Sequence, residues 1–108
     1  MIRVMSFSYR MGVPKNVDMV FNCRVLRNPH LVPRLRELTG KHPAVQEYVL
    51  ADSNALLILK DALASAEDGM TIAFGCYGGR HRSVTMAEKL AEELKRAGSE
   101  VELVHRDL

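Results

Sequence analysis

Residues 74–83, FGCYGGRHRS, bring a cysteine, two arginines, a histidine and a serine together with three glycines. Cys76 and Arg82 are separated by five residues, and Ser83 follows directly. A thiolate can attack phosphorus, and an arginine fork can hold two phosphate oxygens. Glycines let the backbone turn its amide groups inward toward an anion without steric cost. Three interpretations are open: a nucleophile, an anion-binding loop, or a tight turn that only needs glycine.

The pattern C-x5-R-S resembles the phosphate loop of cysteine-dependent phosphatases. That resemblance implies Cys76 as nucleophile and Arg82 as the residue that holds the phosphoryl oxygens. Such an enzyme also needs an acid that protonates the leaving oxygen. Asp18, Asp52 and Asp107 are the candidates, and none lies in a recognisable acid loop. We therefore expect a binding domain and keep a cysteine-dependent phosphatase as the alternative.

The loop needs a strand before it and a helix after it. Alternating or continuous apolar runs predict four strands, at residues 2–8, 18–25, 70–75 and 100–105. An apolar stripe opposite charged residues predicts an amphipathic helix over 83–97, with Gly98 just beyond its end. At the start of this helix, Ser83 is expected as an N-cap ahead of a role as ligand.

The middle of the chain is expected to be a long connection followed by two helices. Residues 27–43 contain three prolines and Gly40, which predicts a connection with at most one helical turn. Helical spacing over 44–68 predicts two helices, with Asp52-Ser53 as the break and cap between them and Gly69 as the end of the second.

These elements predict an α/β fold: a single small domain over 1–108, with about four mainly parallel strands and flanking helices in two or three layers. The order strand, glycine loop, helix, strand is a βαβ unit, so strands 70–75 and 100–105 should be parallel with a right-handed crossover. Ligands bind such sheets at the carboxyl ends of the strands, where helix N-termini attract anions. The loop over 75–83 is therefore the expected anion-binding site.

Charge and composition agree with this expectation. Residues 1–36 carry seven basic side chains and only one acidic side chain, Asp18, although the whole chain has a net charge of +2. The basic residues fall largely on connections between apolar runs, where side chains can converge on a ligand. The two cysteines and four histidines lack metal-site spacing, and no cofactor is expected. With no long apolar run and no disulfide framework, we expect a cytoplasmic protein that does not bind a membrane.

Four further segments accompany the loop in a recognisable order. GCYGGRHRS resembles the GC-x-GG-[KR]-HRS loop of the C-terminal domain of the RapZ family, the bacterial RNase adapter proteins. SFSYRMGVP (6–14), DMVFNCRVLRNPH (18–30), LRELTGKHPAV (35–45) and the final HRDL (105–108) are similar to other motifs of that domain, so the resemblance covers essentially the whole chain. The family's N-terminal ATP-loop domain lies outside these 108 residues, so ATP binding is not implied.

The resemblance implies a regulatory domain, a sensor or RNA adapter, that binds a sugar phosphate such as glucosamine-6-phosphate and contacts small RNA. A homodimer stays open as a further expectation. By position, the ligand-binding residues would be those of the loop: Cys76, Tyr77, Gly78, Gly79, Arg80, His81, Arg82 and Ser83. Arg10, Arg24 and His30 would extend a basic surface for the ligand or RNA.

The chain departs from the family pattern at several positions. Asn22 and Cys23 replace the usual aspartate and valine, Tyr77 replaces the usual threonine, and Met11 stands where a histidine is common. These departures, with the missing basic C-terminal tail, weaken the RNA inference more than the anion inference. Cys23 is expected to be a buried core thiol; if it and Cys76 lie on adjacent strand ends, a redox link between them is an option.

Overall fold

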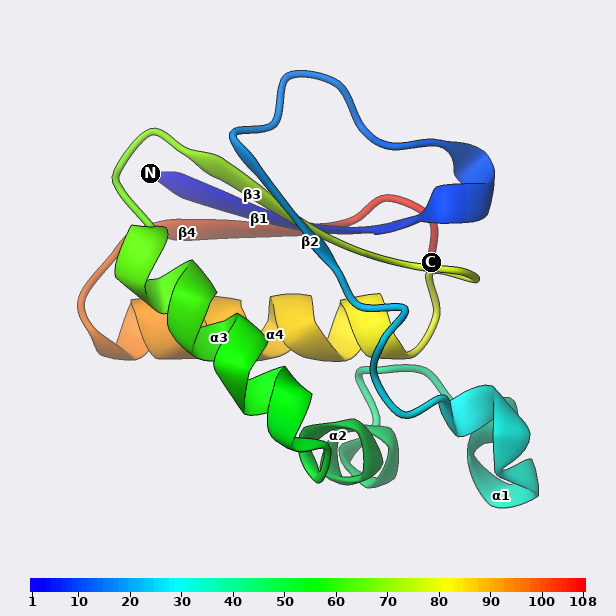
Figure 1. The fold of residues 1–108 in the computed structure, drawn as a ribbon. Helices are drawn as coiled ribbons and strands as arrows, with labels where there is room; N and C mark the ends of the chain where they lie inside the picture. Colours follow the sequence, from blue (N-terminus) through cyan, green and yellow to red (C-terminus); the bar gives the residue numbers. More distant parts are fainter.

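Four parallel strands form one sheet in the computed structural model, which describes residues 1–108. The strands are β1 (Ile2–Ser8), β2 (Met19–Asn22), β3 (Thr71–Cys76) and β4 (Val101–His105), in the spatial order β2-β3-β1-β4 (Figure 1). The predicted α/β class with about four mainly parallel strands is confirmed. β3 and β4 are parallel, as predicted, but β1 lies between them.

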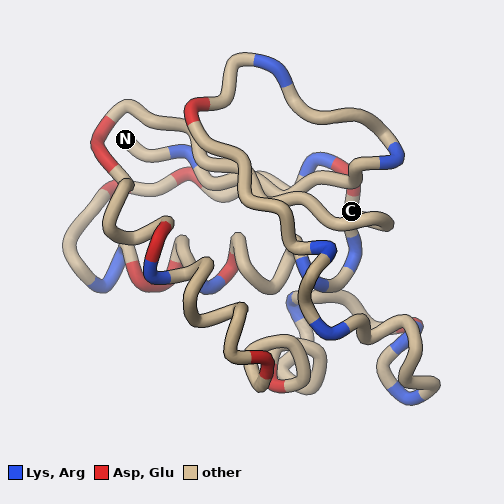
Figure 2. The backbone as a smooth tube through the Cα atoms, in the orientation of Figure 1, with Lys and Arg blue, Asp and Glu red and all other residues tan.

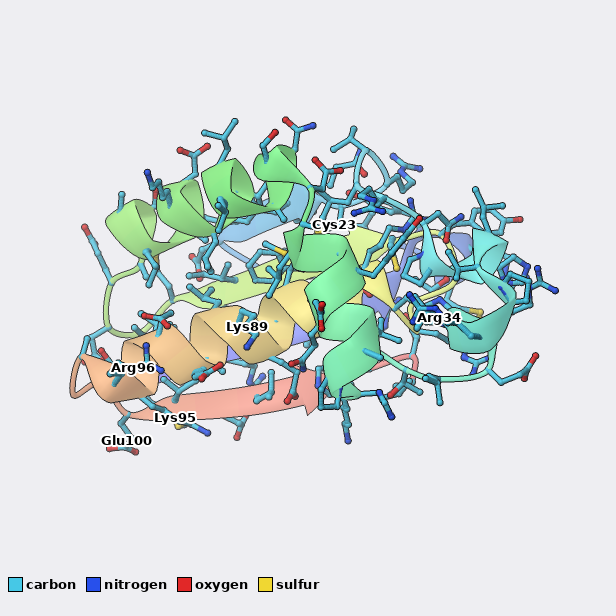
Figure 3. The ribbon with its side chains drawn as sticks, turned by 90° about the horizontal axis from the view of Figure 1, so that it is seen from below. Cys23, Arg34, Lys89, Lys95, Arg96 and Glu100 are labelled. Atoms are coloured by element: carbon cyan, nitrogen blue, oxygen red, sulfur yellow. The ribbon has the colours of Figure 1, made fainter.

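The helices cover one face of this sheet, so the fold has two layers rather than three (Figures 1 and 3). They are α1 (Pro33–Arg36), α2 (Pro43–Leu50), α3 (Ser53–Ser65) and α4 (Arg82–Arg96), with 3-10 turns η1 (Tyr9–Met11) and η2 (Pro29–Leu31). The core lies between the layers, where Ile72 and Phe74 of β3 and Met86 and Leu90 of α4 are fully buried. No helix of the structure is both long enough and apolar enough to cross a membrane.

Two predicted segments differ in detail. The strand expected over 18–25 pairs only over Met19–Asn22, because Cys23 opens a turn that the Leu26 amide closes on the Cys23 carbonyl at 3.2 Å. The connection 27–43 contains two short helical turns, η2 and α1, where at most one was expected. Pro29 and Pro33 each open one of them, because the fixed φ of proline suits the first helical position.

The predicted break between α2 and α3 is confirmed. The Asp52 carboxylate caps α3 by accepting from the Asn54 amide at 2.9 Å, and its other oxygen accepts from the Arg27 amide at 3.0 Å. α3 ends at Ser65, and Gly69 forms the following turn with φ +90° instead of ending the helix itself. α4 begins at Arg82, with His81 at the N-cap position, so the N-cap prediction for Ser83 is wrong.

Candidate functional site

A pocket of about 360 Å³ opens at the carboxyl ends of the strands, beside the connection from β3 to α4. It is lined by Arg10, Asn28, His30, Cys76, Tyr77, Gly78, Arg80, His81 and Arg82. The fold thus brings Arg10 and His30, which the family resemblance singled out, to the loop residues from distant parts of the sequence. Arg24, Gly79 and Ser83, also singled out from the sequence, do not line it.

The three glycines in and beside the loop, Gly75, Gly78 and Gly79, differ in whether and why their positions favour glycine. Gly79 has φ +70°, which favours glycine, and a Cβ there would lie 3.0 Å from the Cβ of Ser8. Gly75 lies inside β3, where a Cβ would come within 2.3 Å of the Phe7 ring. Gly78 has open space around it and no positive φ. The Ser8 hydroxyl donates to the Tyr77 carbonyl at 2.6 Å, so the last residue of β1 holds the loop by a hydrogen bond.

Arg82 is only 7% exposed, yet it lines the pocket. Its Nη1 donates to the carbonyl oxygens of Arg24 at 2.9 Å and of Leu26 at 3.4 Å. Its Nε and Nη2 make no hydrogen bond within the protein, although other arginines of the chain use these atoms. The guanidinium is therefore fixed on one side by backbone oxygens and has donors left for a ligand.

Arg24 does not line the pocket; it supports Arg82, which does. Its guanidinium carbon stacks 3.8 Å from the Tyr9 ring centroid, and its Nε donates to the Asn22 side chain at 3.1 Å. Its carbonyl is one of the two that hold Arg82. Asn28, which lies in the predicted connection over 27–43, lines the pocket while its side chain accepts from the His30 amide at 3.1 Å. Nothing in the local pattern distinguishes this asparagine from an ordinary turn residue.

The segment between α1 and α2 packs under the other end of the loop. The Gly40 amide donates to the Arg80 carbonyl at 2.8 Å, and Arg80 Nη2 donates to the Glu37 carbonyl at 3.2 Å. A Cβ on Gly40 would lie 2.4 Å from the His81 carbonyl oxygen and 2.5 Å from the Thr85 amide nitrogen. Gly40 therefore allows the backbone approach that positions the start of α4. The sequence shows the TG dipeptide but not this partner.

His81, whose backbone lies against Gly40, is buried, and its Nε2 lies 3.1 Å from the Arg36 carbonyl oxygen. Burial lowers the pKa of His81, and the charge of Arg80 adds to this, although hydrogen bonds to the Leu38 and Arg36 carbonyls oppose it. The ring is therefore neutral at pH 7, with Nε2 as the donor to Arg36. It can contribute a directional hydrogen bond to a ligand, but little charge.

Cys76 contacts Ser83 at the start of α4. Its Sγ lies 3.1 Å from the Ser83 hydroxyl oxygen and accepts from the Ser83 amide at 3.4 Å. This explains the position of Ser83 in the C-x5-R-S pattern: its side chain faces the thiol instead of capping the helix. The thiol lies in the pocket lining at the N-terminus of α4, which is where the phosphatase alternative requires its nucleophile.

No candidate acid accompanies that thiol. Asp18 accepts from the Thr71 amide at the opposite end of β3, and Asp52 caps α3. Asp107 accepts from the Ser8 amide at 2.7 Å. Although partial burial opposes ionisation of Asp107, hydrogen bonds from Arg106 and Ser8 hold the pKa of its carboxyl below the ordinary value. Asp107 is thus ionised at neutral pH, and no carboxylate lines the pocket.

The charge around the pocket is positive. Figure 2 shows Lys and Arg predominating at the end of the sheet where the strands finish. Arg10, Arg80 and Arg82 line the pocket, and none of them forms a salt bridge. The arrangement can attract an anion and hold it with fixed donors.

Known proteins are similar to this chain over nearly its whole length. A nucleotide-binding protein of Paramagnetospirillum magneticum is 48% identical over 97% of this chain and 38% of its own length. Nucleotide-binding proteins of Ruegeria sp. and Thermobifida fusca are 48% and 44% identical over 95% and 97% of this chain, and 38% and 40% of their own lengths. The chain thus spans about two fifths of the length of the curated relatives it matches.

The family comparison covers the same region and includes every residue of the pocket. The match to the RapZ C-terminal domain runs over residues 1–108, so it contains β1 to β4, the loop and both segments that support it. This confirms the resemblance carried by the loop and the four accompanying motifs. The chain belongs to the RapZ C-terminal domain family.

Proposed function

We propose that this chain is a regulatory domain that binds the phosphate group of a small phosphorylated ligand in the pocket beside the loop. The observation that carries the proposal is the pocket lining: three arginines and two histidines, with no carboxylate, next to the N-terminus of α4. A phosphate there would meet the positive dipole of the helix as well as the guanidinium groups.

Each arginine has a distinct place in this proposal. Arg82, fixed through Nη1, offers Nε and Nη2 as a fork for two phosphate oxygens. Arg80 and Arg10 approach from the loop and from η1, and the guanidinium carbon of Arg10 lies 5.5 Å from the Tyr77 ring centroid. Because carbonyls and aromatic rings hold these side chains, less ordering is required when the anion binds.

The rest of the pocket supports a ligand with polar groups beyond the phosphate. Its volume lies at the lower end of the range for small-molecule sites. Asn28 and the neutral His81 can exchange hydrogen bonds with hydroxyl groups, and the exposed Tyr77 can cover a ring. We therefore propose a sugar phosphate, with glucosamine-6-phosphate as the first compound to test. A nucleotide is the next, because the relatives are called nucleotide-binding proteins.

The remaining expectations belong to the same proposal. Residues 1–108 would act as a single domain in the cytoplasm, and its ligand state would be reported to a partner. Contact with small RNA at the basic surface is the partner role that the family implies. Steep loss of RNA affinity with rising salt would support phosphate contacts, and a flat response would argue against them.

The test is calorimetric titration of the reduced chain with inorganic phosphate, glucosamine-6-phosphate and a nucleoside monophosphate. We expect binding of phosphate and tighter binding of the preferred organic phosphate. Arg82→Lys keeps a charge but loses the fork, so affinity should fall about tenfold or more. Arg80→Ala should weaken binding without disturbing the supports of Arg82.

Arg96→Ala is the matched control, since Arg96 closes α4 as Arg82 opens it and is paired with Glu93 at 2.7 Å. It should bind like the unaltered chain. Absence of heat with all three ligands, or equal binding by Arg82→Lys and the unaltered chain, would show that the pocket is not a phosphate site.

A cysteine-dependent phosphatase is the second candidate, favoured by the contact between Cys76 and Ser83. The absence of a carboxyl group from the pocket lining speaks against efficient catalysis. Turnover of p-nitrophenyl phosphate should therefore be absent. Turnover that disappears in Cys76→Ser and is retained in Cys23→Ser would reverse the order of the two candidates.

A further inference from the structure

Two free cysteines meet at the carboxyl ends of β2 and β3. The strands pair in register from Met19 with Ile72 to Asn22 with Gly75. The Cys23 amide then donates to the Gly75 carbonyl at 2.7 Å, so the next residues in register are Cys23 and Cys76. Both belong to the core cluster between sheet and helices, and Cys23 is labelled in Figure 3.

This placement suits a disulfide. Neighbouring strands lie about 4.8 Å apart, within the roughly 4.4–6.8 Å over which Cα atoms of bonded cysteines are found. Cys23 is the last residue before the chain turns away from the sheet, and Cys76 is the last residue of β3. Both therefore lie where a strand end can adjust. We propose that Cys23 and Cys76 form a reversible disulfide under peroxide and that this bond switches the pocket to a weakly binding state.

The two thiols differ in their access to the pocket, and this difference decides which one reacts with peroxide first. Cys76 is 2% exposed and lines the pocket, so peroxide reaches it from there, and its Sγ accepts a hydrogen bond from the Ser83 amide. Cys23 is fully buried. Burial raises the pKa of its thiol far above the ordinary range, and the adjacent Cys76 adds to this rise. Cys76 is the attacking residue and Cys23 the resolving residue.

The chemistry is balanced with hydrogen peroxide as oxidant. The Cys76 thiolate attacks one peroxide oxygen; an S–O bond forms, the O–O bond breaks, and hydroxide leaves and takes up a proton to form water. The sulfur is oxidised to a sulfenic acid. The Cys23 sulfur, losing its proton, then attacks the Cys76 sulfur; the S–S bond forms, the S–O bond breaks and a second water leaves. An external dithiol reverses the step by thiol–disulfide exchange, as suits a transient bond in a reducing compartment.

The same bond would disturb the pocket at two points. Cys76 Sγ would leave its contacts with the Ser83 hydroxyl and amide and turn toward Cys23. Cys23 also opens the turn whose carbonyls, from Arg24 and Leu26, hold the Arg82 guanidinium. A displaced turn releases Arg82 from the position in which it faces the pocket. This consequence rests on the proposed phosphate site, whereas formation of the disulfide does not.

The test treats the reduced full chain with hydrogen peroxide, blocks remaining thiols with iodoacetamide and measures the intact mass. We expect loss of two hydrogens, no alkylation, a crosslinked peptide containing Cys23 and Cys76, and recovery of both thiols with dithiothreitol. In Cys23→Ala, Cys76 should stop at a sulfenic acid that dimedone traps. Cys76→Ser should remain reduced at Cys23 for much longer, and circular dichroism should show that both variants fold.

Titration with inorganic phosphate before and after oxidation tests the switch. We expect at least a tenfold loss of affinity in the unaltered chain, reversed by dithiothreitol. Persistent free thiols, or disulfides found only between two chains on a non-reducing gel, would overturn the proposal. A disulfide with unchanged phosphate affinity would overturn the switch. If reduced and oxidised chains both fail to bind phosphate while the disulfide forms, the proposed function fails and the switch with it, but the thiol chemistry stands.

Discussion

The two ends of the sheet use their charged side chains differently. At the amino end, charges meet each other: the terminal amino group pairs with Asp68, and Arg3 pairs with Glu102 at 2.6 Å. At the carboxyl end, arginines meet carbonyl oxygens and aromatic rings. Arg82 contacts the Arg24 carbonyl, and Arg27 stacks 4.0 Å from the Tyr48 ring centroid. Arg106 also forms a salt bridge at this end, with Asp107.

This difference separates charge that is neutralised from charge that is kept. A carboxylate cancels the field of a cation, whereas a carbonyl oxygen or a ring fixes its orientation and leaves its net charge in place. Exposed ion pairs such as Arg3 with Glu102 contribute little to folding. The arginines at the carboxyl end are therefore ordered before any ligand arrives, which is what an anion site requires. The two ends can be told apart by substitutions whose effects on stability and on binding differ.

The largest expected effect is on stability, at Gly40→Ala. The new Cβ would meet backbone atoms of His81 and Thr85 at 2.4 and 2.5 Å, and neither can move aside as a flexible side chain would. We expect a loss of about 3 kcal/mol in the free energy of unfolding, measured by urea denaturation.

Two further glycine-to-alanine variants show whether the loss of stability in Gly40→Ala comes from steric overlap or from backbone conformation. Gly98→Ala, at the amino end with φ +94° and no atoms nearby, should cost about 1 kcal/mol. Gly78→Ala, in the loop with open space and no positive φ, should leave stability nearly unchanged. A Gly40→Ala variant no less stable than Gly98→Ala would show that the close approach under α4 does not constrain the fold.

A second pair of variants separates the two kinds of charge directly. Arg10→Ala should weaken phosphate binding about tenfold, because it removes a pocket cation, and should leave the unfolding midpoint almost unchanged. Arg3→Ala should do the reverse, with a cost below about 1 kcal/mol in stability and unaltered phosphate affinity. Calorimetry gives the phosphate affinity of each variant, and urea denaturation gives its free energy of unfolding. Equal binding losses in the two would mean that net charge alone, and not the pocket, attracts the anion.

The sequence predicted the parts of this site that depend on neighbours in the chain. The apolar run, the glycines and the amphipathic helix place the loop of 75–83 at a strand end. Short-range patterns also suggested that Ser83 caps α4, and here they failed, because the thiol of Cys76 competes for the serine side chain. The resemblance implied that Arg24 extends a basic surface for the ligand or RNA; in the structure its guanidinium stacks on Tyr9 and its carbonyl supports Arg82. Such roles depend on which distant segment comes close, and that information is absent from a local pattern.

Gly40 illustrates the same limit for packing. A glycine before a charged residue in a proline-containing connection indicates a turn. Its actual constraint is the distance between two backbones that are about forty residues apart in the chain, with Gly40 donating to Arg80. The motif resemblance included this glycine without explaining it, and the structure supplies the reason.

The smallest expected effect is a pH dependence at the carboxyl end. The pKa of His81 is lower in the folded chain than its ordinary value of 6.5, chiefly because the ring is buried. The unfolded chain therefore binds a proton at His81 more readily than the folded chain does. The resulting stability is fully present above pH 6.5 and is lost as the pH falls from there toward the lower, folded pKa.

Urea denaturation from about pH 7.5 down to about pH 5.5 should thus show falling stability. His81→Asn removes the titrating ring while keeping a donor for the Arg36 carbonyl, so its curve should be flatter over the same range. Saturating phosphate should also flatten the curve of the unaltered chain, because an anion in the pocket favours protonated His81. If His81→Asn follows the same slope as the unaltered chain, the acid sensitivity comes from another histidine. The carboxyl end would then differ from the amino end only in its arginines.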